Sequence, residues 1–293
     1  MKRRASPLET VWVEVPDAAV EAYEAALSSV CDTVGFFLAD EAQGVWRVEG
    51  VREQGADNGP LLAALALAGA ATGLDAPLQR DATEAEGWVL RTLEAFPEQL
   101  VGARFAVRGT HDAGRPTPGR ITLVLDAGVA FGSGEHGSTR GCLRAFERVM
   151  RRKPRRVLDL GTGSGILAMA AAKALRRPAL ATDIEPWSVR VAGENARRNG
   201  VGRLVRPVLA DGWRSRHVRD GRYDLVFANI LARPLCRMAR GTAAHLRPGG
   251  TAILSGLLHS QARMVLQAHR RCGLRLQRAI PDGAWTTLVV RKA

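Results

Sequence analysis

Residues 157–167 decide the fold, and they read Val157-Leu158-Asp159-Leu160-Gly161-Thr162-Gly163-Ser164-Gly165-Ile166-Leu167. The first four residues are apolar apart from one acid, which predicts a strand. An almost continuous run of Ala, Leu and Met at 166–175 predicts a helix. Three glycines between them allow positive φ and let a ligand approach the main chain. Because the free N–H groups at the start of the helix point toward such a ligand, the stretch predicts a nucleotide-binding turn.

Two acids around this turn indicate which nucleotide it binds. The dinucleotide fingerprint is G-x-G-x-x-G, and here Ile166 stands in place of its third glycine. A carboxylate at Asp159 would repel a pyrophosphate but suits S-adenosylmethionine, which carries an ammonium and a sulfonium and no phosphate. Asp183 ends the next apolar run about 20 residues after the glycines, where an acid binds ribose hydroxyls. The pattern resembles the first two motifs of class I methyltransferases; a dinucleotide-binding protein and a turn without a ligand are the alternatives.

Charge is distributed unevenly along the 293 residues, whose formal net charge is +13. Residues 1–81 hold 6 Lys or Arg against 13 Asp or Glu, whereas residues 82–293 hold 36 against 16. The split predicts two domains with different partners. An acidic front domain suits a basic protein, and a basic rear domain suits a minor contact with ribosomal RNA. Arginines scattered by a GC-rich genome would give the same count.

The composition predicts a cytoplasmic protein without membrane contact. No apolar run reaches the roughly 18 residues of a membrane span. The basic start Met1-Lys2-Arg3-Arg4 is not followed by the hydrophobic region of a signal peptide. The four cysteines (Cys31, Cys142, Cys236, Cys272) lie far apart, so we expect reduced thiols and no metal site.

Three segments make up the expected domain organisation. Residues 1–81 read as a strand over 10–15, a helix to residue 27, strands over 34–38 and 45–51, and a helix over 59–67. This β-α-β-β-α order predicts a small α+β ferredoxin-like domain without a catalytic constellation, interpreted as a substrate-recognition module. Residues 82–97 follow with helical spacing and predict a linker helix that Pro97 ends. Residues 98–293 are the expected methyltransferase domain.

A loop before the glycine turn carries the most specific motif. It reads Phe131-Gly132-Ser133-Gly134-Glu135-His136-Gly137-Ser138-Thr139 and resembles the F-G-T-G-x-H-x-T-T signature of the PrmA family. Those enzymes methylate large-subunit ribosomal protein eleven. Serines replace two threonines of the signature, and Gly137 stands where proline is frequent. Further matches run from about residue 100 to the end, whereas the front domain matches only in size and element order.

The resemblance assigns roles residue by residue. Thr139 matches a threonine that contacts the cofactor, or else it is the N-cap of a helix over 140–150. Asp211, after a weak strand over 204–209, matches the adenine-holding position, or else it caps a helix or a turn. Asn229, where the fourth strand ends, can accept a hydrogen bond from a substrate nitrogen, or else it is a turn residue. His136 matches the family histidine, which is either a base or a residue that orients the backbone.

The expected function follows from these roles. The cofactor, S-adenosylmethionine, is bound by Thr139, Asp159, Gly161, Gly163, Asp183, Asp211 and Asn229, with Asn229 also catalytic. The resemblance implies a Rossmann-like domain with a seven-stranded sheet. It also implies methyl transfer to lysine and N-terminal amines of ribosomal protein eleven, and we expect a monomer. One alternative is a class I RNA methyltransferase, although the chain lacks Asn-Pro-Pro-Tyr and a catalytic cysteine motif. The other is a ribosome-associated binding protein with a vestigial cofactor site.

Overall fold

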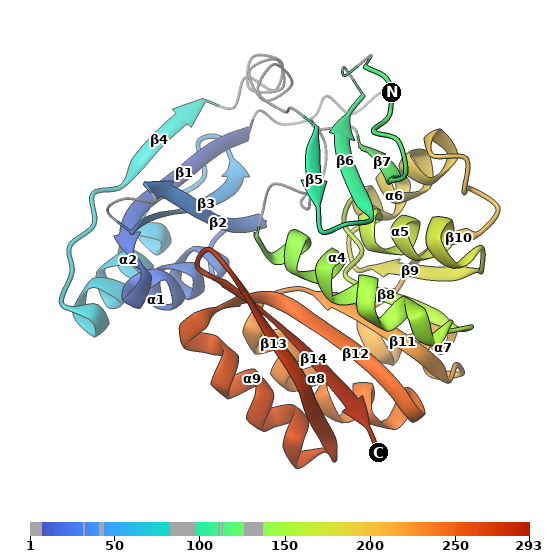
Figure 1. Ribbon diagram of the computed structural model, residues 1–293. Coiled ribbons are helices and arrows are strands. Elements are labelled where there is room, and N and C mark those ends of the chain that lie inside the picture. Colours follow the sequence, from blue (N-terminus) through green and yellow to red (C-terminus); the bar gives the residue numbers. More distant parts are fainter. Residues whose placement is uncertain are drawn as a thin grey trace. The chain divides into compact units, whose positions relative to one another are not determined.

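The computed structural model describes residues 8–31, 33–40, 44–82, 98–110, 112, 114–125 and 137–293 (Figure 1). Two compact units divide the chain, Met1–Trp88 and Val89–Ala293. The linker helix expected over 82–97 lies outside the described residues, apart from Ala82. The loop over 126–136, with His136, lies outside them too. Among the described residues, no helix has the length and apolar character to cross a membrane.

The first unit is an antiparallel sheet with two helices. Its elements are β1 (Leu8–Pro16), α1 (Asp17–Ser28), β2 (Thr33–Asp40), β3 (Val45–Glu53), α2 (Gly59–Thr72) and β4 (Gln79–Ala82). The strand order β2-β3-β1-β4 with this element order is that of a ferredoxin-like domain. Alternate residues of β1 (Val11, Val13, Val15) are buried, as a sheet with one covered face requires. The sequence analysis missed β4, a short and polar edge strand that pairs with β1.

The second unit contains a seven-stranded sheet in the order β10-β9-β8-β11-β12-β14-β13. Its strands are β8 (Val157–Leu160), β9 (Ala179–Asp183), β10 (Val205–Leu209), β11 (Tyr223–Asn229), β12 (Leu246–Leu258), β13 (Leu274–Asp282) and β14 (Trp285–Lys292). The five strands β10, β9, β8, β11 and β12 are parallel to one another. β14 runs antiparallel to both of its neighbours, β12 and β13. The expected Rossmann-like domain with a seven-stranded sheet is therefore confirmed.

Helices cover both faces of this sheet (Figure 1). They are α4 (Gly137–Val149), α5 (Ile166–Leu175), α6 (Pro186–Arg198), α7 (Arg216–Arg219), α8 (Ala232–His245) and α9 (His259–Arg271), with short 3-10 turns at Met150–Arg152 and Gly212–Arg214. Phe146 of α4 packs against Phe227 of β11 with ring centroids 5.4 Å apart. The neighbouring Val226 belongs to the opposite core, which also contains Leu235 of α8 and Val265 of α9. Adjacent residues of β11 therefore belong to two hydrophobic cores, one on each face of the sheet.

A second, three-stranded sheet precedes the large one in the chain. Its strands are β5 (Gln99–Val101), β6 (Phe105–Gly109) and β7 (Ile121–Leu125), in that order. Asn199, at the end of α6, accepts the N–H of Val124 at 2.9 Å and donates to its carbonyl at 2.6 Å. The amide of Asn199 therefore satisfies a residue on the edge strand β7, as a neighbouring strand would. The sequence analysis missed β5, which has three residues.

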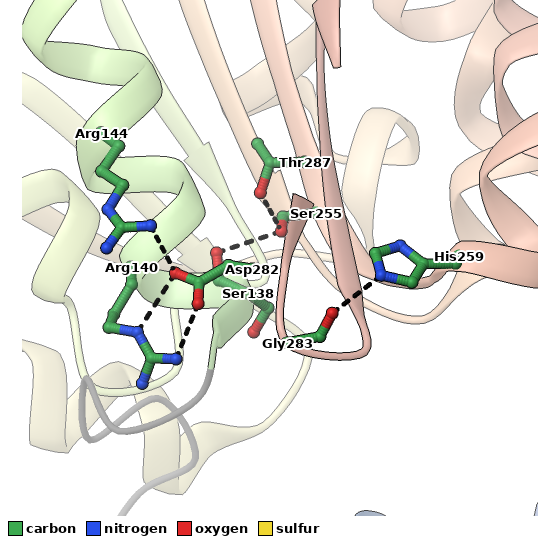
Figure 2. A network of polar contacts seen from close by, with 8 residues as sticks. All are labelled: Ser138, Arg140, Arg144, Ser255, His259, Asp282, Gly283 and Thr287. Atoms are coloured by element: carbon green, nitrogen blue, oxygen red, sulfur yellow. Dashed lines mark hydrogen bonds and ion pairs between the residues drawn. The ribbon is translucent and has the colours of Figure 1, made fainter. Parts of the chain in front are cut away.

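The β13–β14 hairpin holds the first turns of α4 (Figure 2). Asp282 accepts two hydrogen bonds from Arg140, at 2.8 and 3.2 Å, and one from Arg144 at 3.0 Å. Ser255 donates to the carbonyl of Ser138 at 3.0 Å and lies 2.7 Å from the hydroxyl of Thr287. These contacts fix the position of the helix that carries Thr139.

Two glycines let α4 approach the hairpin this closely. A Cβ at Gly137 would lie 2.5 Å from the carbonyl oxygen of Asp282, and one at Gly141 would lie 2.2 Å from Oγ1 of Thr287. The two positions are four residues apart, so they share one face of the helix. This face has no room for a side chain.

We expect Gly141→Ala to lower the free energy of unfolding by up to about 2 kcal/mol. The overpacking cost of about 1–3 kcal/mol exceeds the gain of about 1 kcal/mol in helix propensity. Gly193→Ala in α6 is the matched control, because its Cβ would meet its nearest atom, Cγ of Pro207, at 3.5 Å. That variant should be stabilised by about 0.5–1 kcal/mol. Urea denaturation measures the free energy of unfolding of both variants. Equal stabilisation of the two would contradict the close approach of α4 to the hairpin.

Candidate active site

The candidate residues converge at the carboxyl ends of the parallel strands. β8 lies where the strand order turns, with β9 and β10 on one side and β11 and β12 on the other. Parallel α/β sheets bind their ligands in the crevice at such a point. Asp159 lies on β8, while Asp183 and Asn229 end β9 and β11. Each strand therefore delivers one polar side chain to the same edge.

The glycines of the turn serve different purposes. Gly161 has a φ of 67°, and a Cβ there would lie 2.3 Å from Cγ2 of Ile230, which follows β11. Gly165 has a φ of 84° and is the N-cap of α5, where a Cβ would lie 3.0 Å from Cβ of Ala192 on α6. Gly163 donates its N–H to Asp183 at 2.9 Å. The turn is thus closely packed against β11 on one side and α6 on the other.

Asp159 is a buried carboxylate with one satisfied oxygen. Its side chain is 1% exposed, and Oδ2 accepts the hydroxyl of Thr162 at 2.6 Å and the N–H of Ala168 at 3.1 Å. Oδ1 is buried and has no hydrogen-bond partner among the described residues. Burial raises the pKa of Asp159 to about 7, and the bonds from Thr162 and Ala168 oppose this shift. A buried acceptor of this kind suits a cationic group of a ligand.

Asp183 joins the end of β9 to the glycine turn. Oδ2 accepts the N–H of Gly163, and Oδ1 accepts the N–H of Glu185 at 3.1 Å. The side chain is half-buried. Each carboxylate oxygen keeps a further lone pair, so Asp183 can still accept hydrogen bonds from two hydroxyls of a ligand.

Thr139 and Asn229 meet although 90 residues separate them. The amide nitrogen of Asn229 donates to Oγ1 of Thr139 at 3.3 Å, and Thr139 is completely buried. Thr139 lies within α4, two residues after its first residue Gly137, so its interpretation as the N-cap of this helix is wrong. The hydrogen bond uses the nitrogen of the Asn229 amide and leaves its oxygen available to accept another donor.

Asp211 is the outlying candidate. It follows β10, its side chain is 55% exposed, and it lies 3.1 Å from a guanidinium nitrogen of Arg214. The preceding Ala210 donates its N–H to the carbonyl of Asp183 at 2.8 Å, which keeps the two strand ends together. The contact of Asp211 with adenine stays a prediction.

The sequence analysis missed three residues that support the turn. Thr162 donates its N–H to the carbonyl of Thr182 at 2.9 Å, and Thr182 donates its hydroxyl to the carbonyl of Asp159 at 3.1 Å. Asn195, fully buried on α6, donates to the carbonyl of Ser164 at 3.0 Å. The available signals were a threonine among the glycines, a threonine at the end of an apolar run, and an asparagine that follows Val191 and Ala192 at helical spacing.

Comparisons with known proteins agree with this geometry. The family model described as "Ribosomal protein L11 methyltransferase (PrmA)" matches residues 18–293. A ribosomal protein L11 methyltransferase of Rhizobium etli is 47% identical over 216 residues, which are 73% of this chain and 74% of that protein. One from Bradyrhizobium diazoefficiens is 48% identical over 214 residues, 72% of each chain. The crystal structure of a ribosomal protein L11 methylase from Lactobacillus delbrueckii subsp. bulgaricus superposes with a TM-score of 0.62 at 32% identity. It covers 67% of this chain and 99% of its own.

Binding of S-adenosylmethionine should strengthen as pH rises through the pKa of Asp159. Only the ionised carboxylate attracts the ligand ammonium, and a pKa of about 7 means that the ionised fraction rises about eight-fold from about pH 6 to about pH 7.5. We expect a similar fall in Kd, measured by titration calorimetry. Asp159→Asn should bind more weakly, and its Kd should change less than two-fold over the same range. A wild-type Kd independent of pH would show that Asp159 does not face the cation.

Proposed function

The chain belongs to the ribosomal protein L11 methyltransferase (PrmA) family and is an S-adenosylmethionine-dependent protein methyltransferase, and on this premise we propose that it methylates amine nitrogens of ribosomal protein L11. The proposed acceptors are lysine side chains and N-terminal amines, on the protein free or in the ribosome. The proposed enzyme is a cytoplasmic monomer.

The contact between Asn229 and Thr139 carries this proposal. It lies at the edge of the sheet where ligands of this fold bind, beside the strand that leads into the glycine turn. Because Thr139 holds the amide nitrogen, the amide oxygen of Asn229 can accept a hydrogen bond from an incoming amine. That bond would direct the amine lone pair toward the methyl group.

The described residues fit the proposed cofactor. The unpartnered Oδ1 of Asp159 can accept an ammonium hydrogen, and Asp183 can accept ribose hydroxyls. Thr139 and the main chain at Gly161 and Gly163 complete the methionine end of the proposed site, and Asp211 the adenine end. When bound, S-adenosylmethionine supplies an already activated electrophilic methyl group. The protein therefore has to contribute position and exclusion of water rather than activation.

The acceptor amine must lose a proton before it can attack. A lysine amine has a pKa of about 10.4 in water, and transfer into a low-dielectric site lowers it. The amide of Asn229 cannot remove the proton, because it has no ionisable group. We propose that desolvation of the amine and release of the proton to water suffice, with Asn229 orienting the neutral amine.

Substrate recognition is assigned in this proposal to the first unit. Its residues 1–81 are acidic, and its Trp12, Glu14, Val45, Arg47, Pro77 and Gln79 line a hollow of about 550 Å³. An acidic surface favours a basic ribosomal protein as partner through electrostatic complementarity.

Removal of the Asn229 amide should reduce transfer more than binding. We expect Asn229→Ala to lower kcat on the order of 10²-fold at saturating cofactor, as loss of a positioned polar group does elsewhere. Thr139→Val should lower kcat about ten-fold, while Thr139→Ser, which keeps the hydroxyl, should stay near wild type. The assay uses radiolabelled S-adenosylmethionine with unmethylated ribosomal proteins from the same source.

Each outcome of this assay assigns the acceptor. Label on one small basic ribosomal protein that depends on Asn229 supports the proposal. Label on RNA would overturn it in favour of an RNA methyltransferase, and tight cofactor binding without any label would favour a vestigial site. A full transfer rate with Asn229→Ala would remove Asn229 from the mechanism.

Deletion of residues 1–82 should separate recognition from cofactor binding. The cut follows β4, so it removes the whole first sheet and leaves both cores of the second unit. We expect the Kd for S-adenosylmethionine to stay within about three-fold and methylation of the ribosomal protein to fall more than about 10²-fold, since binding energy from outside the site is lost. Retained methylation would refute the division of labour.

A further inference from the structure

Exposed cations gather at the amino ends of the parallel strands, opposite the cofactor crevice. The segment that leads into β8 alone contributes Arg151, Arg152, Lys153, Arg155 and Arg156, all exposed. Three of these cations precede the buried Pro154 and two follow it. The sequence gives no reason to group them with cations elsewhere.

The segments that enter the neighbouring strands add five more cations. Arg176 and Arg177 precede β9, Arg203 precedes β10, and Arg219 and Arg222 precede β11, and all are exposed. Since these strands are parallel neighbours, their amino ends lie at one edge of the sheet. We call the ten residues the amino edge.

Backbone contacts keep these segments side by side. Asp224, on β11, accepts the N–H groups of Arg155 and Arg156 at 2.9 and 2.8 Å. The N–H of Ala179 donates to the carbonyl of Leu204 at 2.9 Å, which joins the starts of β9 and β10. Neighbouring strands lie about 4.8 Å apart, so the four strands carry the amino edge across about 14 Å.

Few carboxylates oppose this charge. Among the described residues, only Arg219 of the ten lies within ion-pairing distance of an acid, 3.8 Å from Asp220. The opposite edge of the sheet carries Asp159, Asp183 and Asp211. At the amino edge, the ten cations therefore outnumber the carboxylates of Asp220 and Asp224.

Helix dipoles account for part of the pattern only. Cations at a helix C-terminus are favourable, which explains Arg151, Arg152 and Arg176. Arg155, Arg203 and Arg222 lie in the connections beyond the helix ends. Lys153 and Arg176, both with a φ of 51°, are the two non-glycine residues with positive φ in the described part of the chain. A glycine would fit both positions with less strain, so the backbone conformation does not explain why cations stand there.

We propose that the amino edge binds the phosphate backbone of RNA. Nine of its ten cations are arginines, whose planar guanidinium groups bind phosphate oxygens in pairs. A stripe of one sign about 14 Å long matches a polyanion with closely spaced charges better than a single bound ion. The main-chain contacts that align the segments leave the side chains exposed to such a partner.

The bound RNA is an anchor rather than a methyl acceptor. β11 begins directly after the amino edge and ends at Asn229, seven residues in all, and an extended strand of that length spans about 20 Å. A phosphate on the amino edge therefore lies far from the transfer site. The contact is independent of the acceptor assigned above, and it explains the uneven charge of the chain without an RNA methyltransferase.

The test compares two triple variants that remove the same charge. Arg155→Gln, Arg203→Gln and Arg222→Gln neutralise three segments of the amino edge. Arg237→Gln, Arg240→Gln and Arg263→Gln neutralise three exposed arginines on α8 and α9. Fluorescence anisotropy with a labelled RNA hairpin of about 30 nucleotides gives Kd from about 50 to 200 mM KCl. We expect the first variant to bind at least about ten-fold more weakly at about 100 mM, with a log Kd against log salt slope smaller by about 2–3. The second should bind within about two-fold of wild type.

Other results overturn the proposal. Equal weakening of RNA binding by both triple variants would mean that RNA responds to the overall charge of the protein and not to the amino edge. A wild-type Kd above about 100 μM at physiological salt is weaker than non-specific binding and would mean that the amino edge does not bind RNA. Binding to anionic lipid vesicles without binding to the hairpin would assign the amino edge to a membrane surface. A second amino-edge triple, Arg151→Gln, Arg152→Gln and Arg177→Gln, must reproduce the first. Methylation of the ribosomal protein should persist in all three variants, which separates this test from that of the proposed function.

Discussion

The carboxylate of Asp159 constrains the shape of the glycine turn. Its Oδ2 binds both the hydroxyl of Thr162 and the N–H of Ala168, so the turn and the first residues of α5 close around it. Its Oδ1 is left buried without a partner among the described residues, and burial raises its pKa to about 7. An unpaired buried acceptor is unfavourable in the free protein. In the function proposed above, this oxygen accepts the ammonium of the cofactor, so the proposal links the cost in stability to ligand binding.

The sequence predicted the parts of the fold that depend on local pattern. The glycine turn with its flanking strand and helix follows from apolar runs separated by glycines, and the seven-stranded sheet follows from the family resemblance. β4 and β5 could not be found, since edge strands of three or four residues carry no usable alternation. The start of α4 was misplaced because it depends on contacts with a hairpin more than a hundred residues away, including Asp282.

For the site, sequence reasoning chose the residues but not their interactions. Thr139 and Asn229 were selected by resemblance, and their hydrogen bond depends on how α4 packs on the sheet. Asn195 was hidden within a helical pattern, and its contact with Ser164 arises only in the fold. The amino edge was invisible for the same reason. Its arginines are dispersed from residue 151 to residue 222, and parallel strand order brings them together. The roles of the site residues toward the cofactor stay predictions.

The pairing of α4 with the hairpin determines when during folding the site becomes complete. Arg140 and Asp282 are 142 residues apart, and Ser138 and Ser255 are 117 apart. Contacts of such long range form after local ones, because the intervening chain must first lose its conformational freedom. β14 also has to pair with β12 before Thr287 can meet Ser255. The Rossmann-like strands and the glycine turn can therefore form early, whereas Thr139 reaches Asn229 only when the hairpin docks, and maturation of the enzyme is a late event in its folding.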